Sequence, residues 1–428
     1  MSEEAPKKSV EEVLQEVRFA ERLAEVEARL PTTLVLAKEG TLAKRNQVRR
    51  KLYRDSEIIR IEIEDKLNEY GIEGEWATSP VIKEANKKLD AVRAQLHLDV
   101  LPSTGTQLEK IYMFARLATF ALVFVGWFSA VIALYPLRLL DSTLKGLGVP
   151  KNYLPMDIVA WGMASLFCLS AGSDFVTEGR EHVLALKDSA VFMFSHASNL
   201  DGFVVNAASP VALKFGAKKS LFMIPLLGWG ARWCLDYVAI DRSNRKSALA
   251  SLKELSQAVN ERGYSISISP EGTRSKDGLL QEFKKGPFYL RDDTKKSVVP
   301  ALVFGAYELW PPGRLFATPG KTLMRFLPEF IPDPSKNRNQ NRLALRRIYL
   351  DGFADDVPED IGQGADNNGV LKNVFFMYIV WAITIKVTFT SLSLISGFCG
   401  LVGISMWTFF KLSMVVSVGL EALMFYTC

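Results

Sequence analysis

A histidine and an aspartate at short spacing are the residues of this chain best suited to acid–base chemistry. His196 follows the apolar run Val191 to Phe194 and Ser195, and Asp201 stands five positions after it. A carboxylate that folds back to the imidazole fixes its tautomer and stabilises the imidazolium, as a general base near neutral pH requires. Taken alone, the pair also fits a surface or helix-capping role for Asp201. The pair therefore predicts a general base only if other polar groups converge on it.

Three further blocks of residues follow the histidine at the ends of predicted strands. They are Asp241-Arg242, the run Ser269 to Ser275, and Val298 to Ala301. A fourth segment, Phe283-Lys284-Lys285-Gly286, lies between the last two. Because the carboxyl ends of parallel strands meet at one edge of a sheet, we expect these blocks to converge over His196.

This ordered set of motifs resembles those of a known enzyme family. His196-x4-Asp201, Ile240 to Arg242, Pro270 to Ser275 and Val299-Pro300 are similar to the four motifs of the glycerolipid (lysophospholipid) acyltransferase family, typified by 1-acylglycerol-3-phosphate acyltransferases. The resemblance covers roughly residues 180 to 330. Ser195 departs from the pattern, because asparagine is frequent at that position in the family. That residue is not expected to perform the chemistry.

The resemblance implies transfer of an acyl group from acyl-CoA to a lipid hydroxyl. The thioester is already activated, so the enzyme needs a base more than a nucleophile of its own. We expect His196 to take the hydroxyl proton with Asp201 orienting the ring, a contribution of roughly 10² to 10⁴ in rate. The chain has no Gly-x-Ser-x-Gly elbow and no cysteine near the motifs, which favours direct transfer without an acyl-enzyme.

The resemblance also implies a binding site for the acceptor's phosphate. Arginine suits bidentate contacts to phosphate, so Arg242 and Arg274 are the expected ligands, assisted by Lys284 or Lys285. For Arg242 the alternative is a salt bridge to Asp241 or another carboxylate. The remaining residues implied to shape the substrate site are Glu271, Gly272, Thr273 and Pro300. Glu271 could equally hold an arginine in place, and Pro300 could pack against acyl-CoA.

The elements that must position these residues alternate between strand and helix. Predicted strands cover Val191 to Phe194, Leu221 to Ile224, Tyr237 to Ile240, Tyr264 to Ile268 and Val298 to Phe304. The clearest helical window between them is Ser243 to Glu261. The predicted fold class is therefore α/β, a mostly parallel twisted sheet with helices, flanked by membrane helices and an N-terminal α-helical region.

Long uncharged runs indicate membrane segments on both sides of this domain. Leu117 to Leu137 and Val387 to Phe410 each reach the roughly 20 residues that a spanning helix needs. Ile158 to Ser173 is shorter, so a spanning, re-entrant or interfacial segment all fit. The predicted organisation is 1–105 charged and helical, 106–178 membrane helices, 179–335 catalytic, 336–370 polar linker with one basic helix around Arg342 to Leu350, and 371–428 C-terminal membrane helices.

The first section carries a helical pattern without visible chemistry. Ile82, Ala85, Leu89, Val92 and Leu96 step 3-4-3-4, as a heptad seam does. A small bundle that packs on itself explains this pattern, and a coiled coil that mediates self-association is the alternative.

Composition excludes several other classes of function. The net charge of +5 over 428 residues is too small to argue for nucleic-acid binding, although it suits an anionic lipid surface. The four cysteines show no paired spacing, so neither a disulfide framework nor a metal site is expected. No cofactor is expected beyond acyl-CoA as co-substrate. Residues 1–12 show no apolar region of a cleavable secretory signal.

The sequence thus predicts a membrane-bound O-acyltransferase that converts lysophosphatidic acid to phosphatidic acid. The expected partners are acyl-CoA, a lysophospholipid acceptor and membrane lipids, and the expected location is the endoplasmic reticulum membrane. Glycerol 3-phosphate or another lysophospholipid is an alternative acceptor. A non-catalytic membrane scaffold and a membrane thioesterase or lipase are the alternatives from other classes.

Overall fold

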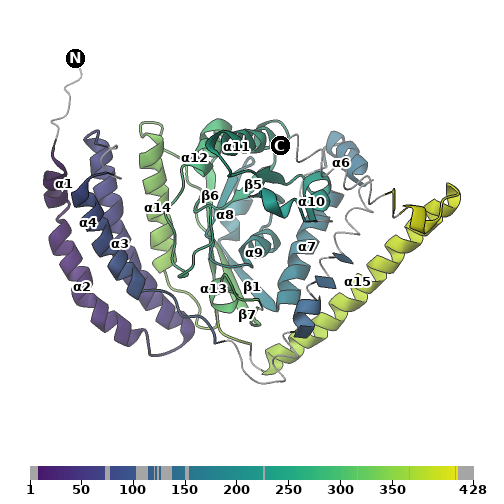
Figure 1. The fold of residues 1–428 in the computed structure, drawn as a ribbon, viewed down its shortest axis with the longest axis horizontal. Coiled ribbons are helices and arrows are strands. Elements are labelled where there is room, and N and C mark those ends of the chain that lie inside the picture. The colour runs from purple at the N-terminus through teal and green to yellow at the C-terminus, as the bar shows by residue number, and fades with distance from the viewer. Residues whose placement is uncertain are drawn as a thin grey trace, which may run out of the picture.

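A seven-stranded sheet forms the centre of the computed structural model, with helices on both of its faces (Figure 1). The structure describes residues 8–72, 78–102, 114–119, 121–122, 125–126, 137–149, 154–224, 227–315, 317–365, 367–409 and 411–412. The strands are β1 (Ser173–Glu178), β2 (Val191–Phe194), β3 (Leu213–Lys218), β4 (Val238–Ile240), β5 (Ser265–Ile268), β6 (Val298–Phe304) and β7 (Gly320–Phe326).

The strands lie in the order β1-β7-β6-β2-β5-β3-β4. All neighbours pair in parallel except β6 and β7, which are antiparallel. The strand β2 lies between β6 and β5, and all four of its residues are buried, so it is a continuous apolar run instead of an alternating one. The predicted α/β class with a mostly parallel sheet is confirmed.

Helices α7 (Pro155–Ala171) and α9 (Asp201–Ala208) pack on one face of the sheet. The other face shares a core with α11 (Arg245–Asn260), α12 (Gly286–Thr294), α14 (Arg338–Ala354) and the N-terminal helices. The N-terminal helices are α1 (Val10–Glu16), α2 (Phe19–Leu36), α3 (Leu42–Glu69) and α4 (Pro80–Gln95). The remaining helices are α6 (Leu137–Gly146), α8 (Arg180–Leu184), α10 (Leu227–Trp229), α13 (Ala306–Leu309) and α15 (Asn367–Leu401).

The N-terminal helices form a bundle that lies beside α14 (Figure 1). The predicted seam of Ile82, Ala85, Leu89 and Val92 is buried within the chain, in the core that these helices share with the sheet. The N-terminal region therefore packs on its own chain, as the bundle interpretation predicts. Self-association through these helices stays a prediction.

The predicted linker between the catalytic domain and the C-terminal membrane helices differs from the structure. Residues 336–370 were expected to be a polar linker with one basic helix around Arg342 to Leu350. That helix is α14, but it packs on α3 and β6 as part of the core. Its Arg342 and Arg346 are buried against Glu64 and Glu57 of α3. A helix with buried arginines looks polar in the sequence although it belongs to the core.

The catalytic sheet also begins earlier than predicted. Strand β1 starts at Ser173, inside the segment 106–178 that was expected to hold only membrane helices. Helix α7 ends at Ala171 with Gly172 in the left-handed conformation (φ 71°), which turns the chain directly into β1. The predicted span 117–137 lies largely outside the described residues.

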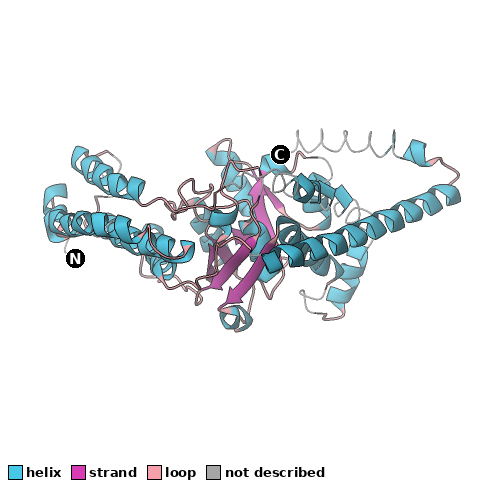
Figure 2. Cartoon of the chain, turned by 90° about the horizontal axis from the view of Figure 1, so that it is seen from below, coloured by secondary structure: helices cyan, strands magenta, loops and turns pink. Residues whose placement is uncertain are grey.

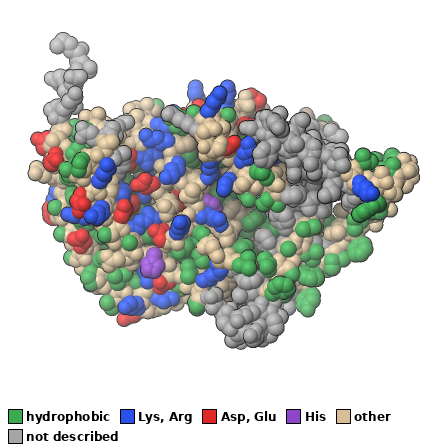
Figure 3. All heavy atoms as spheres, in the orientation of Figure 1, with side chains coloured by type: hydrophobic (Ala, Val, Ile, Leu, Met, Phe, Trp, Pro, Cys, Tyr) green, Lys and Arg blue, Asp and Glu red, His purple; other side chains and the backbone are tan. Residues whose placement is uncertain are grey.

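The C-terminal helix α15 extends away from the sheet (Figure 2). Within the described residues, Phe375–Leu401 is the one helical stretch long and apolar enough to cross a membrane. Hydrophobic side chains gather along it, whereas charged side chains cover the N-terminal helices (Figure 3). The helix ends at Leu401, before the end of the predicted run Val387 to Phe410, and Gly403 follows with a positive φ of 69°.

Candidate active site

His196 lies just beyond the carboxyl end of β2, where its ring meets Asp201. The distance between His196 Nδ1 and Asp201 Oδ2 is 2.9 Å. A carboxylate accepts, so Nδ1 carries the proton and Nε2 keeps its lone pair. The ring is about a quarter exposed and lines a cavity, while Asp201 is buried. This is the geometry predicted for a base and its orienting carboxylate.

The position of Asp201 follows from the turn between β2 and α9. The same oxygen, Oδ2, accepts the main-chain N–H groups of Ala197 and Ser198, both at 2.7 Å. Asp201 is the first residue of α9, where a negative charge meets the positive end of the helix dipole. Three donors therefore hold the Asp201 side chain in place beside the histidine.

A cavity of about 690 Å³ opens beside His196. Its walls are largely apolar and come from α7, β2, α9, β3 and the segment after β3. The apolar lining includes Met163, Phe167, Phe194, Phe203, Phe215 and Leu221. A space of this size and character accommodates an extended hydrocarbon chain.

Two arginines bring positive charge to the same cavity. Arg242 and Arg274 both line it. Arg242 Nη1 donates to the carbonyl of Gly272, and Arg274 Nη1 donates to Asn199 Oδ1. Among the described residues neither arginine forms an ion pair with a carboxylate. Asp241, the neighbour of Arg242 in the sequence, pairs with Lys219 at 3.2 Å instead. Both guanidinium charges thus remain available to an anion.

Glu271 lies behind His196 and does not line this cavity. Its Oε1 accepts the main-chain N–H of His196 and its Oε2 that of Gln281, both at 2.7 Å. Burial raises the pKa of Glu271 to about 8, against the two N–H donors, which favour the charged form. Of the two roles considered, holding an arginine or contacting the acceptor, the geometry shows neither. Glu271 holds the backbone of the histidine.

The other predicted substrate residues divide into two groups. Gly272 and Thr273 line the cavity. Gly272 has φ 73°, a conformation that glycine adopts without strain. Lys284 and Lys285 are exposed and lie outside the lining, and Pro300 is buried in β6 opposite Met193. The structure therefore gathers Arg242, Gly272, Thr273 and Arg274 around His196 but not the two lysines or the proline.

Sequence reasoning missed several residues of the site. Asn199 lies inside the His-x4-Asp motif and orients Arg274, a role that its polar type alone did not indicate. Met163 and Phe167 belong to α7, which was considered only as a membrane segment. Lys214 of β3 is buried and pairs with Asp157 of α7 at 2.7 Å.

The serines beside His196 are engaged in structural hydrogen bonds. Ser195 Oγ accepts the N–H of Val303 at 3.0 Å, and Ser198 Oγ donates to the Trp310 carbonyl at 2.8 Å. Neither is arranged as a nucleophile paired with the histidine. Over the part of the chain that the structure describes, no cluster of three His, Cys, Asp or Glu side chains could hold a metal ion.

The part of the chain that holds this site is similar to known proteins. A family model described as acyltransferase matches residues 174–303. The chain is 34% identical over 156 residues to the 1-acyl-sn-glycerol-3-phosphate acyltransferase of Limnanthes douglasii, covering 36% of this chain and 54% of that protein. It is 30% identical over 203 residues to the enzyme of the same name from Saccharomyces cerevisiae, covering 47% and 63%. The chain thus spans about half to two thirds of these relatives.

One solved structure is also similar. The crystal structure of the 1-acyl-sn-glycerophosphate acyltransferase from Thermotoga maritima is 23% identical with a TM-score of 0.48, covering 57% of this chain and 95% of that one. The matched family segment, residues 174–303, contains β2, the His196–Asp201 pair, both arginines and Glu271. The similarity to the acyltransferase family therefore covers residues 174–303, the part of the chain that holds the candidate site.

Proposed function

We propose that this protein transfers the acyl group of acyl-CoA to lysophosphatidic acid, giving phosphatidic acid. The observation that carries the proposal is the His196–Asp201 pair at 2.9 Å on the wall of a largely apolar cavity that also contains Arg242 and Arg274. The relatives named 1-acyl-sn-glycerol-3-phosphate acyltransferase support lysophosphatidic acid as the acceptor.

The reaction is a single displacement at the thioester carbonyl. The acceptor hydroxyl oxygen bonds to the carbonyl carbon while Nε2 of His196 removes the hydroxyl proton. The carbon–sulfur bond then breaks, and the imidazolium returns the proton to the departing thiolate. Asp201 stabilises the imidazolium between these two proton transfers. Atoms balance without a cofactor, and no acyl-enzyme forms.

The cavity suits the two substrates in different ways. Its apolar walls favour the acyl chain, because each buried methylene group contributes roughly 0.8 kcal/mol. Arg242 and Arg274 favour the phosphate, since charge-assisted hydrogen bonds are the strong ones. Holding both molecules at the base supplies the larger share of the rate.

The lipid substrates fit a location at a membrane. Phe375–Leu401 has the length and composition of a spanning helix, and α15 lies beside α7, whose Met163 and Phe167 line the cavity. We therefore propose an integral membrane enzyme whose cavity receives lipid from the bilayer, with the endoplasmic reticulum as its location.

An acceptor panel tests the proposal. Purified protein in detergent is given labelled acyl-CoA with lysophosphatidic acid, glycerol 3-phosphate, lysophosphatidylcholine or no acceptor. We expect label in phosphatidic acid, with much lower incorporation into the others. Release of free acid that does not depend on an acceptor would indicate a thioesterase. No incorporation into any acceptor would refute the enzymatic function.

A further inference from the structure

The loop that follows β5 holds the main chain of His196 on both sides. Glu271 Oε1 accepts the N–H of His196 at 2.7 Å, and the N–H of Ser275 donates to the carbonyl of His196 at 2.8 Å. The same loop, residues 269–285, carries Gly272, Thr273 and Arg274 to the cavity wall. The position of this loop therefore sets the position of the base and of one phosphate ligand.

The loop has no regular secondary structure to hold its distal half. Residues 276–284 belong to neither helix nor strand, so their carbonyls need partners from elsewhere. Tyr307 of α13 bonds the carbonyl of Lys276, and Arg346 and Arg342 of α14 bond those of Gln281 and Phe283. The partners of the segment between these, residues 277–280, come from the N-terminal region. The N–H of Leu98 donates to the Asp277 carbonyl at 2.8 Å, and Tyr53 of α3 donates to the Leu280 carbonyl.

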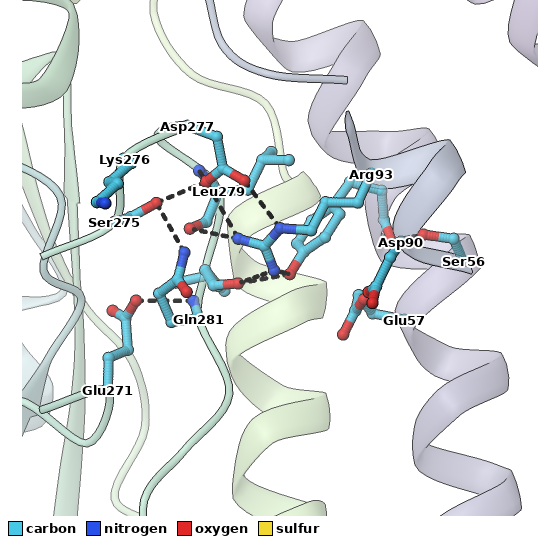
Figure 4. Close-up of polar contacts among 12 residues, drawn as sticks. Ser56, Glu57, Asp90, Arg93, Glu271, Ser275, Lys276, Asp277, Leu279 and Gln281 are labelled. Carbon is cyan, nitrogen blue, oxygen red and sulfur yellow. Dashed lines mark hydrogen bonds and ion pairs between the residues drawn. The ribbon is translucent and has the colours of Figure 1, made fainter. Parts of the chain in front are cut away.

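Arg93 of α4 makes the largest set of these contacts (Figure 4). Its Nε donates to Asp277 Oδ2 at 2.8 Å and its Nη2 to Oδ1 at 3.1 Å, a bidentate pair. Its Nη1 donates to the Leu280 carbonyl at 3.1 Å and to the hydroxyl of Tyr53 at 3.0 Å. The Arg93 side chain is 17% exposed, so these bonds are shielded from water.

A short chain of bonds links Arg93 to the histidine. Asp277 Oδ1 accepts the hydroxyl of Ser275 at 2.7 Å, and Ser275 N–H bonds the His196 carbonyl. A second branch runs through Gln281, whose side chain donates to Ser275 Oγ at 3.1 Å and whose N–H bonds Glu271. Figure 4 shows Arg93 and Glu271 at opposite ends of this network.

We propose that Arg93 is a positioning residue for the acyl transfer, and that the N-terminal helices are a working part of the active site. This inference rests on the proposed function. Arg93 touches no substrate and lies outside residues 174–303, the segment that the family model matches. It fixes residues 277–280, and these fix the two main-chain bonds of His196. Small displacements of a base can lower the rate by on the order of 10²-fold.

The test compares Arg93→Ala and Arg93→Lys with a matched control in the full-length protein. The control is Arg22→Ala, which removes a part-buried ion pair from α2 to Glu62 of α3 and leaves the loop untouched. Arg93→Ala is expected to lower kcat about 10- to 100-fold, with the KM for acyl-CoA within about twofold, because most of the apolar lining comes from other segments. Arg93→Lys keeps one charged contact and restores part of the rate. The control keeps the wild-type kcat.

Two further readouts separate positioning from a general loss of folding. Tyr53→Phe keeps most of the volume but removes the bond to Leu280 and one acceptor of Arg93 Nη1. We expect kcat to fall about threefold while the thermal midpoint falls by only a few degrees. Hydrogen exchange at the amides of residues 196–198 should accelerate in Arg93→Ala and not in Arg22→Ala. Wild-type kcat together with wild-type exchange in Arg93→Ala would overturn the inference. If the wild-type protein itself forms no product, the proposed function fails, and the exchange data still decide whether Arg93 holds His196.

Discussion

The Glu271 carboxylate bonds the main-chain N–H of His196 at 2.7 Å, and it leaves the imidazole ring to Asp201. Two acidic residues therefore hold one histidine in different ways. Asp201 sets the tautomer and orientation of the ring, and Glu271 fixes the position of the backbone. The two carboxylates should consequently give different defects when they are changed.

Asp201→Asn should lower kcat on the order of 10²-fold or more, because an amide cannot stabilise the imidazolium that forms during proton transfer. The KM for acyl-CoA should change little, since Asp201 does not line the cavity. Steady-state kinetics over a range of acyl-CoA concentrations provide the check. A kcat equal to that of wild type would contradict the role assigned to Asp201.

Glu271→Gln should change how stability depends on pH. The pKa of Glu271 is about 8 in the folded protein because of burial, against an ordinary value of 4.5. Between these values the folded state holds a proton that the unfolded chain has lost, so the wild type loses stability as pH rises from 4.5 to 8 and no further above 8. Glutamine does not titrate, so the Glu271→Gln variant does not lose stability in this way as the pH rises.

Thermal midpoints in detergent at pH 5.5, 6.5, 7.5 and 8.5 measure this effect. The midpoint of Glu271→Gln minus that of wild type should increase steadily up to about pH 8. The variant has one acceptor fewer for the two N–H groups, so it should be less stable than wild type at the lowest pH. A difference that does not depend on pH would show that Glu271 is ionised throughout this range.

Arg242→Ala and Arg274→Ala should each raise the KM for lysophosphatidic acid by about 10- to 100-fold, the usual loss for a hydrogen bond to a charged group. Both arginines line the cavity without a carboxylate partner among the described residues. A monoacylglycerol lacks the phosphate, so any slow acylation of it should be affected much less. Lys253→Ala, on the exposed face of α11, serves as the charge control. Equal loss with both acceptors would argue against phosphate binding.

Met163→Trp should shift the preference toward shorter acyl chains. Met163 lies on α7 and lines the apolar part of the cavity, and added volume there shortens the space for a chain. The ratio of kcat/KM for palmitoyl-CoA to that for octanoyl-CoA should fall about tenfold. Leu249→Trp adds similar bulk at an exposed position of α11 and should leave the ratio unchanged. An unchanged ratio in Met163→Trp would place the acyl chain elsewhere.

Local patterns in the sequence were enough to predict the centre of the sheet and the His196–Asp201 pair. β2 and β6 are compact apolar runs and match their predicted bounds, and β5 alternates serine with isoleucine. β3 was missed because Leu213–Lys218 contains a glycine and two lysines. Leu221 to Ile224 was predicted as a strand but forms a turn with Leu221, Met223 and Ile224 exposed. An apolar run does not reveal whether its residues face a core or the mouth of a cavity.

Long-range pairing explains what the sequence could not reveal. Arg346 of α14 is buried because Glu57, 289 positions away, neutralises it. Neither residue alone distinguishes a buried pair from two solvated charges. The contact between Glu271 and the backbone of His196 could not be predicted for a similar reason. A carboxylate near a substrate site can bind the substrate or a main-chain N–H, and the residue type does not distinguish the two roles. The packing of the N-terminal helices on residues 269–285 includes one such pair, Arg93 with Asp277.

The most direct test of the account is labelled acyl transfer by His196→Gln beside wild type, with lysophosphatidic acid as acceptor. Glutamine keeps the main-chain bond to Glu271 and can still pair with Asp201, but it cannot take a proton. The account predicts that wild type forms phosphatidic acid and that the variant forms it at least about 10²-fold more slowly, with a similar thermal midpoint. Incorporation by His196→Gln at the wild-type rate would contradict it.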